Sequence, residues 1–66
     1  MIELKVNGQA HKTNKKTIYD LILEYGLNTR YLAVAYNGEI IDHNQFNEIN
    51  LRNGDSLEIV QPVGGG

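Results

Sequence analysis

The chain has 66 residues, carries a formal net charge of −2 at pH 7 and contains no cysteine. This length allows one small domain, and the lack of cysteine excludes a disulfide framework, a thiol nucleophile and a thiolate metal site. The acidic balance argues against a general nucleic-acid interface. Residues 1–5 contain no apolar signal-peptide core, and no run is long enough to span a membrane. We therefore expect a cytoplasmic protein that binds neither nucleic acid nor membrane.

The first elements predicted along the chain are the two strands of a β-hairpin. Apolar and polar residues alternate over residues 2–6, which is typical of a strand with one buried face. The Asn7-Gly8 pair that follows suits a type I′ turn. Residues 9–13 then form the returning strand, and their polarity predicts an edge position.

One helix is predicted next, over residues 17–25. Thr17 is a candidate N-cap, and Asp20 stands where a capping box prefers glutamate or glutamine. Apolar residues then recur at helical spacing, and Gly26 occupies a position where helices commonly end in the left-handed conformation. Because so short a helix is marginal alone, its apolar stripe must be buried against the sheet.

The second half predicts three more strands, over residues 32–36, 39–41 and 56–61. An Asn-Gly pair ends the first of them, and another precedes the last. The polar stretch before the last strand contains Phe46 and Ile49, and we expect an irregular loop pinned by these two side chains. Pro62 cannot donate to a strand ladder and marks the end of the last strand.

This order of elements predicts an α+β domain over residues 1–61, with one helix packed on one face of the sheet. We expect the buried core to consist of apolar side chains of the strands and the helix: Ile2, Leu4, Val6, Ile18, Leu21, Ile22, Leu32, Val34, Leu57 and Ile59.

The other face of the sheet is left open by a single helix. Alternation places Ala33, Ala35, Glu58 and Val60 there, beside Glu3 and Lys5. Small residues at the centre would leave a shallow apolar strip with charge around it. We interpret Ala33, Ala35, Glu58 and Val60 as a docking surface for a partner, while the alternative is an ordinary solvated sheet face.

The end of the chain is its most specific feature. Val63 is followed by Gly64, Gly65 and Gly66, and glycine contributes no side chain to a core. One interpretation is a frayed terminus. The other is that residues 62–66 form a flexible tail that threads into a narrow channel, with the carboxylate of Gly66 as the reacting group. That carboxylate is ionised at pH 7 and can attack phosphorus as a nucleophile.

The remaining candidates for chemistry are weaker. His11 and His43 have no partner nearby in the sequence, so we expect surface positions and no metal site. Ser56 lacks the glycine pattern of a nucleophile elbow. Lys15 and Lys16 precede a helix N-terminus, where positive charge is mildly unfavourable, and their role is left open.

The chain resembles the ubiquitin-like sulfur carriers. The resemblance is carried by the Gly65-Gly66 end, the Gly54-Asp55 turn before the last strand and the N-terminal hairpin of residues 1–8. It is most similar to the ThiS family, and departs from the terminal diglycine only in a third glycine, Gly64. The resemblance implies a β-grasp fold with a mixed sheet of four to five strands.

The resemblance also implies a reaction cycle in which the chain is a protein substrate and not an enzyme. A ThiF-type enzyme adenylates the Gly66 carboxylate with ATP and magnesium, so the chain itself binds no cofactor. Sulfur from a cysteine desulfurase or a persulfide protein then gives a C-terminal thiocarboxylate. The thiazole synthase ThiG receives this sulfur in thiamine biosynthesis.

Three alternatives stay open from the sequence. The first is a sulfur carrier of the molybdopterin synthase small-subunit type, which is usually a longer chain. The second is a β-grasp binding module with an inert tail. The third is a ubiquitin-like modifier attached to lysines, because that chemistry uses the same activated glycine.

Overall fold

The computed structural model describes residues 1–61 of the chain as one sheet, one helix and two short 3-10 turns. The elements in chain order are β1 (Ile2–Val6), β2 (Gln9–Thr13), α1 (Ile18–Glu24), η1 (Thr29–Tyr31), β3 (Ala33–Tyr36), β4 (Glu39–Ile41), η2 (His43–Gln45) and β5 (Ser56–Val60). Each predicted strand and the predicted helix is therefore present, with ends shifted by one residue at most.

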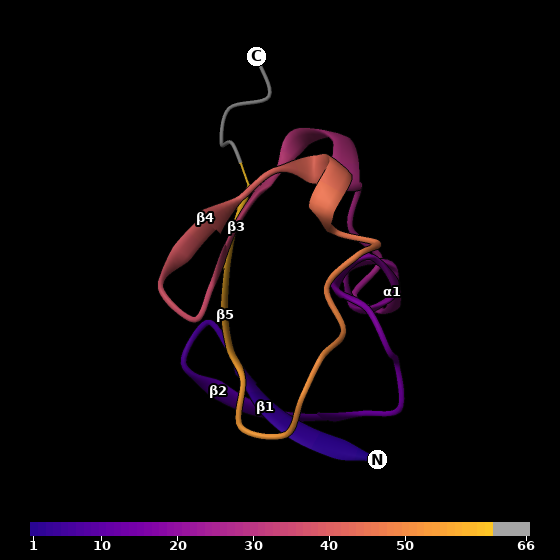
Figure 1. Ribbon diagram of the computed structural model, residues 1–66, viewed down its shortest axis with the longest axis vertical. Coiled ribbons are helices and arrows are strands. Elements are labelled where there is room, and N and C mark those ends of the chain that lie inside the picture. The colour runs from indigo at the N-terminus through magenta and orange to yellow at the C-terminus, as the bar shows by residue number, and fades with distance from the viewer. Residues whose placement is uncertain (62–66) are drawn as a thin grey trace.

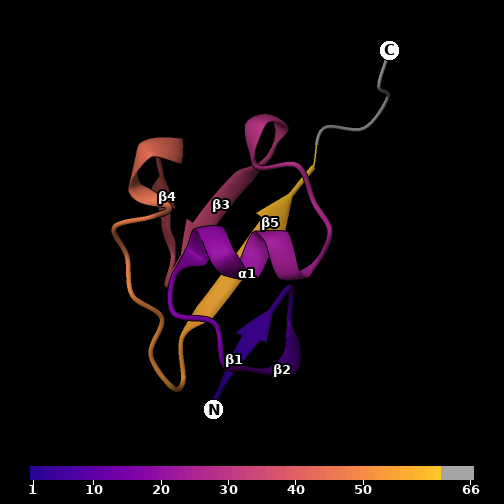
Figure 2. The same cartoon turned by 90° about the vertical axis from the view of Figure 1, so that its right-hand side faces the viewer.

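The five strands form a mixed sheet in the order β2-β1-β5-β3-β4. The first and last strands, β1 and β5, run parallel at its centre, and the other neighbours are antiparallel. Figure 1 shows the strands on one side of the core and α1 on the other, and Figure 2 shows α1 crossing the strands. The α+β arrangement with one helix on one face of a mixed sheet is confirmed.

Local sequence signals set both ends of α1. Thr17 accepts a hydrogen bond from the backbone N–H of Asp20 at 3.1 Å, so it is the N-cap predicted from the sequence. Gly26 has a φ of +76° and ends the helix in the left-handed region. The helix has only seven residues, and Ile18, Leu21 and Ile22 are all fully buried against the sheet. Packing of this apolar stripe therefore stabilises a helix too short to persist alone.

The core lies between α1 and the sheet. Its buried apolar side chains are Leu4, Val6, Ile18, Leu21, Ile22, Leu32, Val34, Ile41, Phe46, Leu51, Leu57 and Ile59. Ile2 lies on the covered face as predicted and packs against the core, but it is only partly buried because it begins β1 at one end of the sheet. Ile41 and Leu51 are core residues that the sequence analysis did not place.

The loop between β4 and β5 is pinned as expected. Phe46 is only 1% exposed, and Ile49 packs against the core while partly exposed. The loop also contains η2, and it is tied to the start of α1 by a hydrogen bond from the Leu51 N–H to the Lys16 carbonyl at 2.7 Å. Anchoring at both points holds the loop on the same side of the sheet as α1.

A buried carboxylate anchors the turn that leads into β5. Asp55 is 7% exposed and accepts hydrogen bonds from the Tyr36 hydroxyl at 2.7 Å, the Asn37 side-chain amide at 3.3 Å and the Arg52 N–H at 2.8 Å. Burial, together with the hydrogen bond to Asp55, raises the pKa of Tyr36 above its usual value. The carboxylate is thus satisfied by three donors, as a buried charge must be, and it joins β3 to the beginning of β5.

Within residues 1–61, no helix has both the length and the apolar character needed to cross a membrane.

Candidate functional site

The predicted reacting group lies just beyond the described part of the chain. Gly66 and the tail residues Val63, Gly64 and Gly65 fall outside residues 1–61, as does the proposed boundary between domain and tail. What the structure fixes is where this segment starts. β5, the strand that leads into it, is a central strand of the sheet and ends at Val60, which pairs with Ala33 of β3. Figures 1 and 2 both place this end of β5 opposite the end at which the N-terminus lies.

The four predicted docking residues come together on the open face of the sheet. Ala33 is the cross-strand partner of Val60, and Ala35 is the partner of Glu58. Neighbouring residues Val34, Leu57 and Ile59 point into the core, so these four point away from α1. Ala33, Glu58 and Val60 are exposed and Ala35 is partly buried. The sequence therefore placed all four on one surface beside the end of β5.

A fifth member of this surface was missed. Ile40 in β4 is paired with Ala35, so it lies on the same open face, and it is 77% exposed. Its signal was present in the sequence: a two-residue Asn37-Gly38 turn pairs Tyr36 with Glu39 and Ala35 with Ile40. We call Ala33, Ala35, Ile40 and Val60 the apolar strip.

The strip is an exposed apolar surface with the charged residue Glu58 beside it. Val60 is 61% exposed and Ile40 is 77% exposed, which is high for large aliphatic side chains. Glu58 lies in the same surface, between the positions of Val60 and Ser56 along β5. Clustered exposed apolar residues rimmed by polar ones are typical of protein–protein contact sites. This surface is therefore a candidate contact site for a partner protein, and it includes part of β5, the strand that precedes the C-terminal segment.

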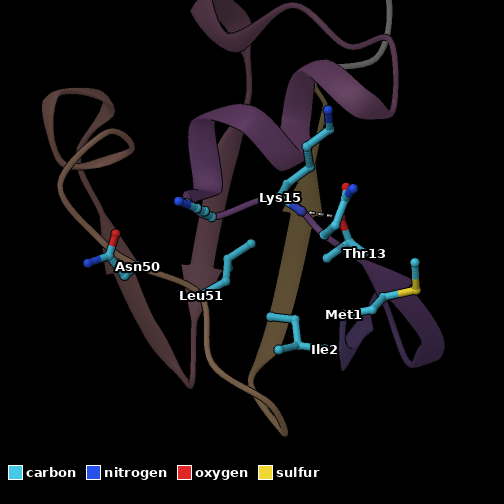
Figure 3. Close-up of a pocket in the computed structure, with 8 residues that line it drawn as sticks. Met1, Ile2, Thr13, Lys15, Asn50 and Leu51 are labelled. Carbon is cyan, nitrogen blue, oxygen red and sulfur yellow. Dashed lines mark hydrogen bonds between the residues drawn. The ribbon is translucent and has the colours of Figure 1, made fainter.

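The opposite end of the sheet carries a hollow of about 370 Å³ between the start of β1, the segment after β2 and the loop near Leu51. Met1, Ile2, Thr13, Asn14, Lys15, Lys16, Asn50 and Leu51 line it, and Figure 3 shows their side chains around it. It lies away from the end of β5, and within residues 1–61 no three His, Cys, Asp or Glu side chains gather as a metal site. We assign this hollow no part in the reaction.

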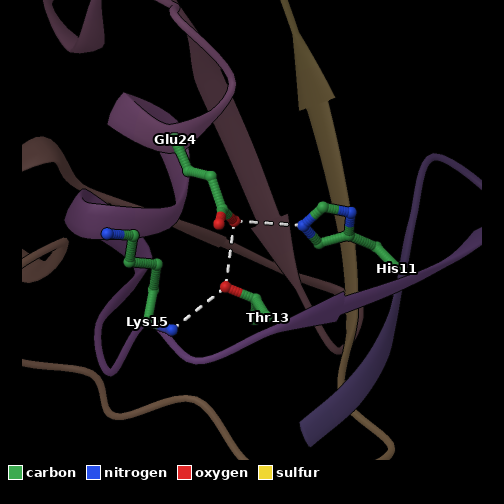
Figure 4. Close-up of polar contacts among 4 residues, drawn as sticks. All are labelled: His11, Thr13, Lys15 and Glu24. Carbon is green, nitrogen blue, oxygen red and sulfur yellow. Dashed lines mark hydrogen bonds and ion pairs between the residues drawn. The ribbon is translucent and has the colours of Figure 1, made fainter. Parts of the chain in front are cut away.

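One prediction about the histidines was wrong. His43 is exposed as expected, but His11 is half-buried, and its Nε2 lies 3.1 Å from the Glu24 carboxylate at the end of α1. The Thr13 hydroxyl donates to the same carboxylate at 2.9 Å and accepts from the Lys15 N–H at 3.0 Å (Figure 4). These contacts join β2 to α1, and the sequence could not show them because residues 11 and 24 belong to separate elements.

The contacts of Glu24 predict an acid-dependent loss of stability. The hydrogen bond to His11 lowers the pKa of Glu24, burial opposes this shift, and the Thr13 hydroxyl adds to the lowering. A lowered folded-state pKa stabilises the fold above the unfolded value of about 4.3, and this stability is lost as the pH falls through the folded-state pKa. We expect Glu24→Gln to flatten the fall in unfolding free energy between about pH 5 and pH 3.

Urea titrations at a series of pH values measure this effect. Glu48→Gln is the matched control, because Glu48 is exposed and makes no ion pair among residues 1–61. An acid limb that is the same in Glu24→Gln and wild type would show that this cluster does not contribute to the pH dependence.

Comparison with known proteins agrees with this geometry. The model of the ThiS family matches residues 4–66. The chain is 40% identical over 65 residues to the sulfur carrier protein ThiS of Bacillus subtilis, covering 96% of this chain and 98% of that protein. It is also 33% identical over 66 residues to a thiazole synthase of Paramagnetospirillum magneticum, but spans only 20% of that longer protein.

The fold has the same relatives. The crystal structure of the thiamine biosynthesis protein ThiS from Geobacter metallireducens superposes with a TM-score of 0.82 at 25% identity, covering 98% of this chain and 100% of that one. A solution structure of a thiamine biosynthesis protein from the same organism gives a TM-score of 0.81, also at 25% identity, covering 98% of this chain and 88% of that one. The β-grasp fold is thus confirmed, and the chain belongs to the ThiS family.

Proposed function

We propose that this chain is a sulfur carrier protein of thiamine biosynthesis, and that the sulfur is carried as a thiocarboxylate formed from the carboxylate of Gly66. The observation that supports this most directly is the match of the ThiS family model through residue 66, which includes the terminal glycines. The same match favours thiamine biosynthesis over the molybdopterin synthase alternative. On this proposal the chain is a substrate of its partner enzymes and acts in the cytoplasm.

The chemistry starts with a poor acyl donor. A carboxylate cannot release oxide, so it must first be activated. In the proposed cycle, a Gly66 carboxylate oxygen attacks the α-phosphorus of ATP on a ThiF-type enzyme, which releases pyrophosphate and leaves an acyl adenylate. Magnesium on that enzyme neutralises the phosphate charge. The absence of a side chain at Gly66 leaves its carbonyl carbon open to the next attack.

Sulfur then enters at the carbonyl carbon. The terminal sulfur of a persulfide, supplied by a cysteine desulfurase or a persulfide protein, displaces AMP and forms an acyl persulfide. A second thiol cleaves the sulfur–sulfur bond, which leaves the thiocarboxylate on Gly66 and a disulfide on the donor side. A thiazole synthase of the ThiG type accepts this sulfur. The similarity to a thiazole synthase from Paramagnetospirillum magneticum supports that last partnership.

Intact-mass spectrometry tests the proposal. The wild-type chain is incubated with a ThiF-type enzyme, magnesium-ATP and a persulfide donor. We expect a mass increase equal to the exchange of one oxygen for one sulfur, assigned to Gly66 by fragmentation. Pyrophosphate release without the donor shows the adenylation step. A mass that never changes would overturn the carrier proposal and favour an inert binding module, while conjugates to lysine would favour a modifier.

The apolar strip is the proposed docking surface for the activating enzyme. Ile40→Asp and Val60→Asp each place a charge on an exposed position of the strip, so the fold should survive. Burying that charge without a partner in the complex is costly, and we expect affinity to fall about ten-fold or more, equivalent to about 1.4 kcal/mol. Titration calorimetry measures this change.

Ala10→Asp is the matched control for the strip. Ala10 is exposed and pairs with Lys5, so it lies on the same open face but on β2, at the far edge of the sheet. The three variants therefore add the same charge to one face at different distances from the end of β5. Equal affinities for all of them and the wild type would remove the strip from the interface.

A further inference from the structure

Two asparagines from the hairpin turns hold β5 by their side chains. Asn7 and Asn37 have φ values of +52° and +49°, as a type I′ turn requires. The Asn37 Oδ1 accepts from the Ser56 N–H at 2.8 Å, and the Asn7 Oδ1 accepts from the Ile59 N–H at 2.7 Å. The first bond holds the start of β5, and the second holds its other end.

The bond from Asn7 lies where β1 has already ended. The parallel pairing of β1 with β5 stops at Val6 and Leu57, and the Asn7 N–H still donates to the Leu57 carbonyl at 2.8 Å. Beyond that point β5 continues to Val60 with β3 as its neighbour. The Asn7 Oδ1 thus takes the place of a backbone carbonyl that a longer β1 would supply to Ile59.

The hydrogen bond from the Ile59 N–H to the Asn7 Oδ1 stabilises the end of β5. Ile59 is only 8% exposed, and loss of the Asn7 side chain would leave its N–H without this acceptor. The next residue, Val60, is a member of the apolar strip, and only six residues lie between Ile59 and Gly66. Loosening at Ile59 would therefore reach both the strip and Gln61, the last described residue.

We infer that Asn7 is a positioning residue that keeps the end of β5 ordered, so that the apolar strip is already formed when it meets the activating enzyme. This role rests on the proposed function. Without the Asn7 bond, the enzyme must order Val60 and its neighbours as it binds. The apparent Kd then equals the intrinsic Kd divided by the fraction of carrier in which that end is already ordered.

Asn7→Gly is the informative variant, because glycine keeps the positive φ of the turn at no steric cost and removes only the side chain. If the ordered fraction falls to about a fifth, we expect the KM for the carrier in adenylation to rise about five-fold. The kcat at saturating carrier should stay within about two-fold, because bound carrier is ordered again. Asn7→Asp retains the acceptor and tolerates the left-handed region, so it should restore the KM.

Asn37→Gly is the matched control for stability. It removes the equivalent bond at the start of β5 and a contact with Asp55, far from Val60 along the strand. We expect its KM to stay within about two-fold of wild type even though its unfolding free energy falls. If Asn7 acted only on stability, Asn7→Gly and Asn37→Gly would have the same KM when compared under conditions of equal unfolding free energy.

Amide exchange followed by NMR tests the structural part on the carrier alone. Asn7→Gly should speed exchange at Ile59 and Val60, while Asn37→Gly should leave these two amides slow. Wild-type exchange at Ile59 in Asn7→Gly, or a wild-type KM, would overturn the inference. If the wild-type chain were never adenylated by the activating enzyme, the proposed function would be wrong, and so would the role of Asn7 in binding that enzyme.

Discussion

Leu57→Ala should unfold much of the protein population near physiological temperature. Leu57 is fully buried in β5, the central strand between β1 and β3. Truncating such a side chain costs about 2–5 kcal/mol, whereas a chain of 66 residues has a total stability of roughly 3–10 kcal/mol at about 0.05–0.15 kcal/mol per residue. The loss is therefore comparable with the whole stability of the domain.

Calorimetry and urea titration measure this loss directly. For a domain of this size, each 1 kcal/mol lowers the thermal midpoint by about 4–8 °C. Val60→Ala is the matched control, because Val60 lies in the same strand but is 61% exposed, and we expect it to change stability by no more than about 0.5 kcal/mol. A Leu57→Ala protein with the wild-type midpoint would contradict the assignment of this strand to the core.

Changing the end of the chain by one residue should abolish sulfur loading without affecting the fold. Removing Gly66 leaves Gly65 as the terminal residue, and adding one alanine after Gly66 converts its carboxylate into an amide. Neither chain presents the Gly66 carboxylate at the position where the proposed adenylation occurs. We expect at least a 100-fold loss of both pyrophosphate release and thiocarboxylate formation, as for a mispositioned reacting group.

The far-ultraviolet spectrum and the thermal midpoint are the controls for this pair. Glycine has no side chain to pack, so both altered chains should melt as the wild type does. They should also still bind the activating enzyme through the apolar strip, which separates a failure of chemistry from a failure of docking. Thiocarboxylate formation on the lengthened chain would show that Gly66 is not the reacting group.

The sequence predicted the fold well because its local signals agreed with one another. Asn7-Gly8 and Asn37-Gly38 adopt the positive φ values expected of such turns, and Thr17 caps the helix as expected. The alternation in β5 correctly separated core residues from open-face residues. These signals depend on residues that are close in sequence, so they can be recognised without knowledge of the tertiary structure.

What the sequence could not predict depended on contacts between distant segments. The Glu24 carboxylate meets His11 across two elements, and the Asn7 side chain reaches Ile59, which is 52 residues away. No periodicity or turn chemistry encodes such pairs, since they exist only after the strands are ordered in the sheet. Ile40 is a different case, because the two-residue Asn37-Gly38 turn sets the register of its hairpin and thereby places Ile40 on the open face.

The parallel pairing of β1 with β5 has a consequence for biosynthesis. The centre of the sheet needs a strand from each end of the chain, because Lys5 pairs with Ser56 and Val6 with Leu57. Contacts so distant in sequence form late and slowly in folding, and β5 is synthesised after the other four strands of residues 1–61. A nascent chain interrupted before residue 56 would therefore expose its apolar helix and hairpin to chaperones and proteases. Folding thus acts as a check that β5, the strand that precedes the proposed reacting residue Gly66, has been made.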